Sequence, residues 1–117
     1  MGADDEGCGS APHGDGRSCD KGLTLAFCFL GKRWNGVLLG TLMDGPAGFS
    51  ELSRAVAGIS DSMLSERLAE LTAAGLVHRR VVPGPPVAVT YELSPAGAAL
   101  IPALTELSRW ASENLRR

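Results

Sequence analysis

Three cysteines and two histidines are the side chains with the most reactive chemistry in this 117-residue chain. Cys8, His13 and Cys19 lie near one another, but their spacing matches no familiar zinc pattern and no fourth ligand is close. His13 and His78 have no nucleophile or carboxylate at a catalytic spacing, and no glycine-rich phosphate loop is present. We therefore expect no metal site, no cofactor and no catalytic residues, so the protein is not expected to be an enzyme.

Thiol chemistry remains open, and it depends on the compartment. Residues 1–20 lack the basic start and apolar run of a secretory signal, and no apolar run approaches the ~20 residues of a membrane span. We expect a cytoplasmic protein that does not enter a membrane, with reduced thiols. Cys19 lies just before a predicted helix with Lys21 nearby, and both features favour a thiolate, whereas Asp20 opposes it. Cys28 is expected to pack within that apolar helix, and Cys8 to be a spare thiol.

A second group of candidates is polar rather than reactive. The region from Phe49 to Leu93 has the pattern of a helix, a short turn, a second helix and a two-stranded hairpin. A tight turn at Gly58 separates the helices, and Gly75 ends the second one. This order predicts a winged helix-turn-helix, a shape that sets its second helix into a DNA major groove.

The second helix, over about residues 61–74, is the candidate recognition helix. Leucines at 64, 68 and 71 form a narrow inward stripe, so the remaining positions point outward. The outward residues of the first turns are small and polar, which suits a groove about 12 Å wide. A solvated surface helix is the alternative, and we prefer it for Glu70 and Ala73. The DNA-contact candidates from this segment are Ser60, Ser62, Met63, Ser65, Glu66 and Arg67.

The hairpin predicts a wing over about residues 82–88, near the DNA backbone. Wings usually place a Lys or Arg on the sugar-phosphate edge, but this proline-rich bend contains none. Arg79 and Arg80 lie on the incoming strand. A phosphate contact by one of them and an internal ion pair with Glu92 or Glu51 remain equal alternatives.

Two flanking helices complete a fold that is mainly α with a small β hairpin. The first, over about residues 23–31, is apolar all round, and the last, from Pro95 to about Leu115, has a broad apolar face. Pro102 should kink this last helix or mark its true start. Both helices present more apolar surface than a small domain covers, which predicts an isologous homodimer formed through the N- and C-terminal helices.

Other expectations concern local packing. Ser50 is expected to cap the helix that begins at Glu51. Leu52, Ala55 and Val56 are expected to face inward. Trp34 is expected to pack in the core rather than stack on a base.

The charge is divided unevenly along the chain. Residues 1–18 are rich in Gly, Asp and Ser, which predicts a flexible acidic tail ahead of a single domain over 19–117. Residues 1–20 carry one base and five acids (1 − 5 = −4), whereas residues 21–117 carry ten bases and eight acids (10 − 8 = +2). The body is therefore mildly basic, which supports nucleic-acid binding only weakly.

An ordered set of short motifs extends from residue 19 to about residue 111. The motifs are Cys19, Arg33-Trp34, Gly45-Pro46, Phe49-Ser50-Glu51-Leu52, Gly58-Ile59-Ser60, Met63-Leu64, Arg67-Leu68, Gly75-Leu76-Val77, Arg79, Pro86, Val89, Tyr91, Leu93, Gly97 and Trp110. In this set the sequence resembles the HxlR-type winged-helix transcriptional regulators, relatives of the MarR group. The resemblance implies a dimeric bacterial regulator that binds double-stranded DNA. Some HxlR-type members sense oxidants or electrophiles through an N-terminal cysteine, which makes Cys19 a redox-sensing candidate.

The sequence departs from the family pattern where charge matters. Basic residues common in the family are replaced by Gly48, by Asp61-Ser62 and by Ala88. Each lost phosphate contact reduces the slope of log affinity against log salt concentration by about one unit. We expect weaker DNA binding, or binding that depends on Lys32, Arg33, Arg54, Arg67, Arg79 and Arg80. The alternative function is a protein-interaction or dimerisation module with little or no DNA binding.

Overall fold

The computed structural model of the protein describes residues 20–115. In chain order its elements are α2 (Lys21–Leu30), α3 (Arg33–Thr41), the 3-10 turn η1 (Leu42–Asp44), β1 (Ala47–Gly48), α4 (Phe49–Ala55), α5 (Asp61–Ala73), β2 (Val77–Val82), β3 (Ala88–Leu93) and α6 (Pro95–Asn114). The order helix, turn, helix, hairpin over α4 to β3 confirms the predicted winged helix-turn-helix. The predicted tail and Cys19 lie outside the described residues.

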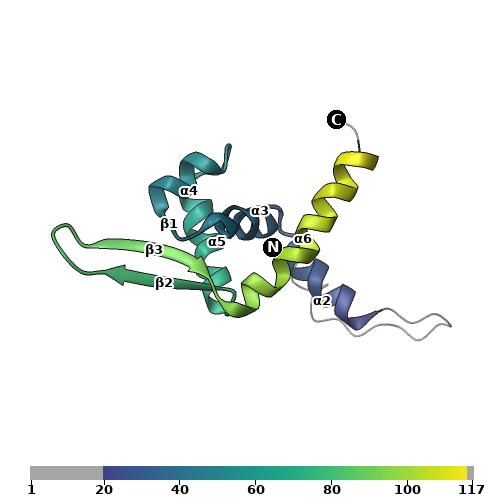
Figure 1. Ribbon diagram of the computed structural model, residues 1–117, viewed down its shortest axis with the longest axis horizontal. Helices are drawn as coiled ribbons and strands as arrows, with labels where there is room; N and C mark the ends of the chain where they lie inside the picture. Colours follow the sequence, from purple (N-terminus) through teal and green to yellow (C-terminus); the bar gives the residue numbers. More distant parts are fainter. Residues whose placement is uncertain (1–19, 116–117) are drawn as a thin grey trace.

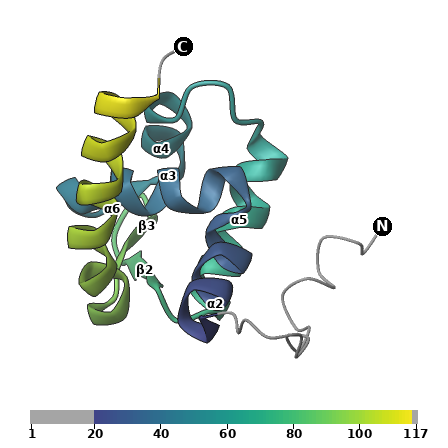
Figure 2. The ribbon, with the colours of Figure 1, turned by 90° about the vertical axis from the view of Figure 1, so that its right-hand side faces the viewer.

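The helices form one body and the hairpin extends from it. Figure 1 shows β2 and β3 projecting to one side, while α6 starts at the base of β3. In Figure 2, α6 and α5 stand on opposite sides and α3 crosses between them, in contact with both. The middle of the body is therefore occupied by α3.

The sheet has one strand more than the predicted hairpin. Its order is β1-β3-β2, and both pairings are antiparallel. The added strand β1 pairs Ala47 with Tyr91 and Gly48 with Thr90. Two residues are too few to show the alternating pattern by which a strand is recognised in a sequence.

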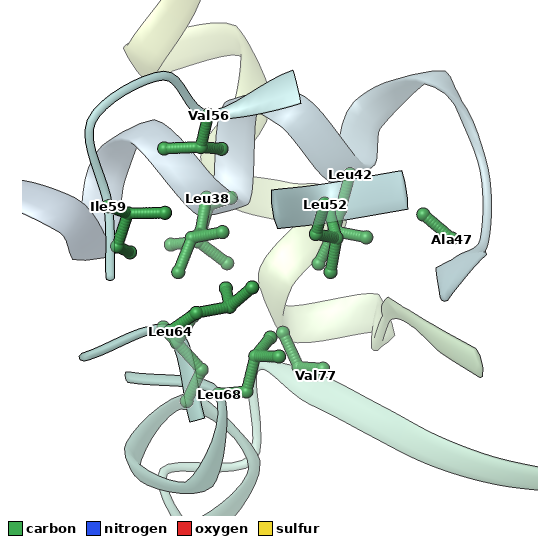
Figure 3. Packing of buried hydrophobic residues seen from close by; sticks show 11 residues of the cluster. Leu38, Leu42, Ala47, Leu52, Val56, Ile59, Leu64, Leu68 and Val77 are labelled. Carbon is green, nitrogen blue, oxygen red and sulfur yellow. The ribbon is translucent and has the colours of Figure 1, made fainter. Parts of the chain in front are cut away.

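The core lies between α3, α4 and α5. Figure 3 shows Leu38 of α3 facing Leu64 of α5, with Val56 and Ile59 of the connecting turn beside them. The predicted leucine stripe of α5 is fully buried. The cluster comprises Leu38, Leu39, Leu42, Ala47, Leu52, Val56, Ile59, Leu64, Leu68, Leu71 and Val77.

The start of α4 differs from the prediction. The helix begins at Phe49 and its N-cap is Gly48, with no side-chain cap, so the expectation that Ser50 caps it is wrong. Gly48 is also the last residue of β1, so the backbone passes directly from the sheet into the helix. Ala55 was expected to face inward, but it is exposed. Within α4 only Leu52 is buried.

A single buried hydroxyl links the end of the helix-turn-helix to α6. Ser94 Oγ accepts from the Gly97 N–H at 3.1 Å and donates to the Gly75 carbonyl at 2.6 Å. Gly75, at φ +81°, follows α5 in the left-handed conformation that favours glycine. The last helix begins at Pro95 and continues through Pro102, so Pro102 does not mark its start.

Gly97 allows the first turn of α6 to lie directly against the chain at Leu76. A Cβ at position 97 would come within 2.2 Å of the Leu76 carbonyl oxygen, which is backbone and cannot rotate away. We expect Gly97→Ala to lower the free energy of unfolding by about 1–3 kcal/mol through overpacking, measured by urea denaturation. The matched control is Gly40→Ala in α3, where a Cβ meets nothing within 4 Å. Alanine there should stabilise by about 0.5–1 kcal/mol, and equal midpoints for the two variants would contradict this account.

Candidate nucleic-acid interface

The outer face of α5 begins with a polar, exposed turn. Ser60 is the N-cap, and its Oγ accepts from the Met63 N–H at 3.1 Å. The first polar positions expected to point outward do so, because the buried leucines occupy the opposite side. The exposed residues along this turn and the next are Ser60, Ser62, Met63, Ser65 and Glu66. Hydroxyl groups and backbone N–H groups thus share one surface at the helix N-terminus.

Arg67 departs from the prediction that it contacts DNA. It is 7% exposed, and its guanidinium forms ion pairs with Glu70 and, at 3.4 Å, with Glu66. Position 67 falls at the edge of the leucine stripe, so the side chain turns inward. Arg67 is therefore paired with carboxylates of its own helix and has little surface left for a phosphate.

Glu70 pairs with two cations that come from different elements. Besides Arg67, the Lys32 Nζ lies 3.3 Å from both Glu70 carboxylate oxygens. Lys32 precedes α3, so this carboxylate ties α5 to the turn between α2 and α3. The expectation of a solvated Glu70 is wrong. The Arg67–Glu70 spacing of three residues was the available signal, since such residues are neighbours on a helix.

The two arginines of β2 have different surroundings. Arg80 forms an ion pair with Glu92 of the neighbouring strand, which realises one of the predicted alternatives. Arg79 makes no ion pair with any residue in the described part of the chain. It lines a shallow groove of about 400 Å³ between α5 and the sheet, together with Ser65 and Tyr91. Arg79 therefore stands beside the outer face of α5.

The remaining predicted cations lie on other elements of the body. Arg54 is exposed in the last turn of α4, close in sequence to the helix-turn-helix turn. Arg33 lies over the Trp34 ring, 4.4 Å from its centroid. Trp34 is half-buried and packs against the core cluster, which confirms its predicted packing role.

Asn35 is a structural residue that sequence analysis missed. It is fully buried, and its Nδ2 donates to the Phe29 carbonyl at 3.1 Å, closing the turn from α2 into α3. A single polar residue in a helical pattern carries no sequence signal for this contact.

The described residues offer little for other chemistry. Within residues 20–115 no group of three His, Cys, Asp or Glu side chains could hold a metal ion. No described helix is both long and apolar enough to span a membrane. Cys28 was expected to be a packing residue of the first helix. It is instead half-buried and disulfide-bonded.

These features define a winged helix-turn-helix protein with a polar, exposed surface on α5. The HxlR-like helix-turn-helix family matches residues 29–117, and the chain belongs to that family. It is a helix-turn-helix transcriptional regulator, as its relatives are named.

Several relatives resemble this chain closely. YodB of Bacillus subtilis (strain 168), an HTH-type transcriptional regulator, is 46% identical over 95 residues, 81% of this chain and 84% of YodB. The structure of reduced YodB matches with a TM-score of 0.74 at 42% identity, covering 86% of this chain and 97% of that one. YodB has also been solved diamide-treated and quinone-bound.

Two further solved structures share the fold. The redox regulator HypR, in its oxidized form, matches with a TM-score of 0.76 at 31% identity, covering 82% of this chain and 99% of HypR. A MarR-family protein of Porphyromonas gingivalis W83 matches with a TM-score of 0.78 at 27% identity, covering 85% and 99%.

The role of Glu70 as an anchor is open to a direct test. Glu70→Ala leaves the buried Arg67 charge without its main partner, which should lower the free energy of unfolding by roughly 1–3 kcal/mol. The control Glu66→Ala removes an exposed carboxylate that also pairs with Arg67, and should cost less than about 1 kcal/mol. Urea denaturation of each variant measures these losses in the free energy of unfolding. Equal losses in the two variants would refute a special role for Glu70.

Proposed function

We propose that the protein binds double-stranded DNA as a homodimer in the cytoplasm, with α5 in the major groove and the β2–β3 wing near the backbone. The observation that carries this proposal is the two-sided character of α5. One side is fixed in the core by buried leucines, and the other exposes small polar residues at the N-terminal turns. Helix-turn-helix proteins contact base edges with those turns.

Base contacts are assigned to the exposed polar residues. Ser62, Ser65 and Glu66 carry donors and acceptors that can meet base edges, and glutamate accepts from cytosine amino groups. Ser60 and Met63 border them at the start of the helix. Asp61 is also exposed here, and it adds a negative charge that phosphates oppose.

Phosphate contacts are assigned first to Arg79 and Arg54. Both are exposed, and Arg79 stands between α5 and the wing, where a DNA backbone entering the groove would pass. Arg33 and Lys32 are secondary candidates, because their cations already interact with Trp34 and Glu70. Arg80 is a weaker candidate, since Glu92 balances its charge.

The dimer is assigned to the apolar surface of α2 and α6. Large hydrophobic side chains on both helices are exposed in the single chain, among them Leu25 at 66% and Trp110 at 51%. The same patch on two copies can bury this surface in an isologous interface. The exposed side chains are Leu23, Leu25 and Phe27 on α2, and Leu107 and Trp110 on α6, with Leu115 just beyond it.

The decisive experiment is footprinting on the intergenic DNA beside the gene, combined with binding at several salt concentrations. A dimer should protect two half-sites about one helical turn, ~34 Å, apart. Affinity should fall steeply as salt rises from roughly 50 to 200 mM. If low-salt affinity were no better than that of an inert acidic protein, the interaction-module alternative would replace DNA binding. The exposed acidic residues Asp61 and Glu66 are the features that favour this alternative.

The assignment of Arg79 predicts a specific change in salt dependence. Arg79→Ala should weaken binding to all sequences alike and reduce the slope of log affinity against log salt by about one unit. The control is the double variant Arg80→Gln with Glu92→Gln, which removes a balanced ion pair and leaves the net charge unchanged. We expect the control to keep the wild-type slope. An unchanged slope in Arg79→Ala would remove this contact from the proposal.

We further propose that Cys19 makes DNA binding sensitive to oxidants or electrophiles. Two observations support this: the similarity to YodB, solved in reduced, diamide-treated and quinone-bound forms, and the similarity to the redox regulator HypR. Diamide should change the operator affinity of the wild type by about tenfold, or ~1.4 kcal/mol. Cys19→Ser should lose this response, whereas Cys8→Ser should retain it. A Cys19→Ser variant that responds like the wild type would exclude Cys19 as the sensor.

A further inference from the structure

The outer part of the β2–β3 hairpin is apolar, exposed and without charge. It extends beyond the helical body (Figure 1), and residues 81–91 contain no Asp, Glu, Lys, Arg or His side chain. Val81 is 55% exposed, Val82 46% and Val87 65%, so bulky β-branched side chains meet solvent along this segment. A hairpin that contacted DNA only through phosphates would need cations here. The composition of the segment therefore indicates a contact of another chemical kind.

The strand register places some of these side chains on the face of the hairpin that is turned toward α5. The register pairs Arg79 with Tyr91 and Val81 with Val89. Because side chains alternate along a strand, both pairs share a face with Val77, which is buried in the core. The Arg79–Tyr91 pair lines the groove beside α5. The Val81–Val89 pair, called the valine pair below, is the next step outward on this face, about 7 Å farther along the strand.

The opposite face of the hairpin carries a second exposed valine. Val82 is paired with Ala88 there, and Arg80 on the same face is balanced by Glu92. Val82 has nearly the same exposure as Val81 and the same side chain, but it lies on the other side of the sheet. The two adjacent valines therefore differ mainly in the face from which they project.

This use of the valine pair rests on the proposed function, in which DNA lies against α5 and Arg79 contacts a phosphate. A pair that lies about 7 Å beyond that phosphate passes the sugar-phosphate edge and reaches the minor groove, which is about 6 Å wide. Deoxyribose rings form the walls of that groove, and their C–H groups are apolar. Other DNA-binding proteins place apolar side chains in the minor groove.

We propose that the valine pair lies in the minor groove against the deoxyribose walls and selects A·T base pairs at that position of the operator. Both kinds of base pair present acceptors on the floor of the groove, and a G·C pair adds the N2 amino donor of guanine. Valine cannot accept a hydrogen bond and expels the water that would, so guanine at this position leaves an unsatisfied donor. The contact itself is neutral and adds affinity without releasing counterions.

Inosine in the DNA makes this selection measurable. Inosine lacks the N2 amino group, so an I·C pair combines the major-groove pattern of G·C with the minor-groove pattern of A·T. Hydroxyl-radical footprinting of the intergenic DNA locates the minor-groove positions protected beside each half-site. Duplexes of that site with A·T, G·C or I·C pairs at those positions are then titrated with the full-length protein by fluorescence anisotropy. The G·C duplex should bind about tenfold more weakly than the A·T duplex, and the I·C duplex should bind like the A·T duplex.

Variants at the two adjacent valines assign the selection to one face. Val81→Asn supplies an amide oxygen that can accept from the guanine amino group, so the A·T and G·C duplexes should bind within about twofold of each other. The slope of log affinity against log salt should stay at the wild-type value, because no charge changes. The matched control Val82→Asn places the same side chain on the opposite face and should keep the tenfold preference. Urea denaturation of both variants checks that the domain remains folded.

Several results would overturn this assignment while leaving DNA binding in place. They are equal affinity for the three duplexes, an I·C duplex that binds as weakly as the G·C duplex, and a preference that persists in Val81→Asn, which would attribute it to groove shape. A Val81→Asn variant whose DNA-free form sediments differently from the wild type, with the duplex preference unchanged, would assign the valine pair to a protein interface instead. A wild-type protein that binds none of the duplexes would overturn the proposed function and this assignment with it.

Discussion

The burial of three leucines on one side of α5 is the constraint on which the rest of the structure depends. Leu64, Leu68 and Leu71 are each at most 1% exposed. Their burial fixes both the position and the rotation of the helix. Because side chains on the opposite side cannot also reach the core, the polar turn that starts at Ser60 stays exposed. The exposed polar surface of α5 is thus a consequence of core packing.

A second layer of contacts holds the C-terminal end of this helix. Glu70 joins α5 to the turn before α3, and Ser94 joins the chain after α5 to the start of α6. Both are polar contacts in part-buried surroundings, where losing a partner is costly because the group left behind is poorly solvated. These contacts fix the positions of charged and hydroxyl-bearing side chains, which apolar packing alone would not determine.

Much of this architecture could be predicted from the sequence, because its signals are local. The leucine spacing predicted α5, Gly75 marked its end, and Pro95 marked the start of the last helix. Three features could not be predicted because they depend on tertiary contacts. The strand β1 exists only through pairing with β3, the burial of Arg67 depends on where α5 rotates, and Asn35 acts through the Phe29 carbonyl. The ion pair of Arg80 with Glu92 likewise separates it from Arg79, a difference that adjacent sequence positions could not show.

The junction at Gly48 gives the two halves of the binding unit a fixed separation. This residue ends β1 and caps α4, so no loop residue lies between the strand paired with the wing and the first helix of the helix-turn-helix. A connection without intervening residues has no slack, and a movement of β3 must be carried into α4 rather than absorbed. The direct join at Gly48 therefore couples the base of the wing to the first helix of the helix-turn-helix.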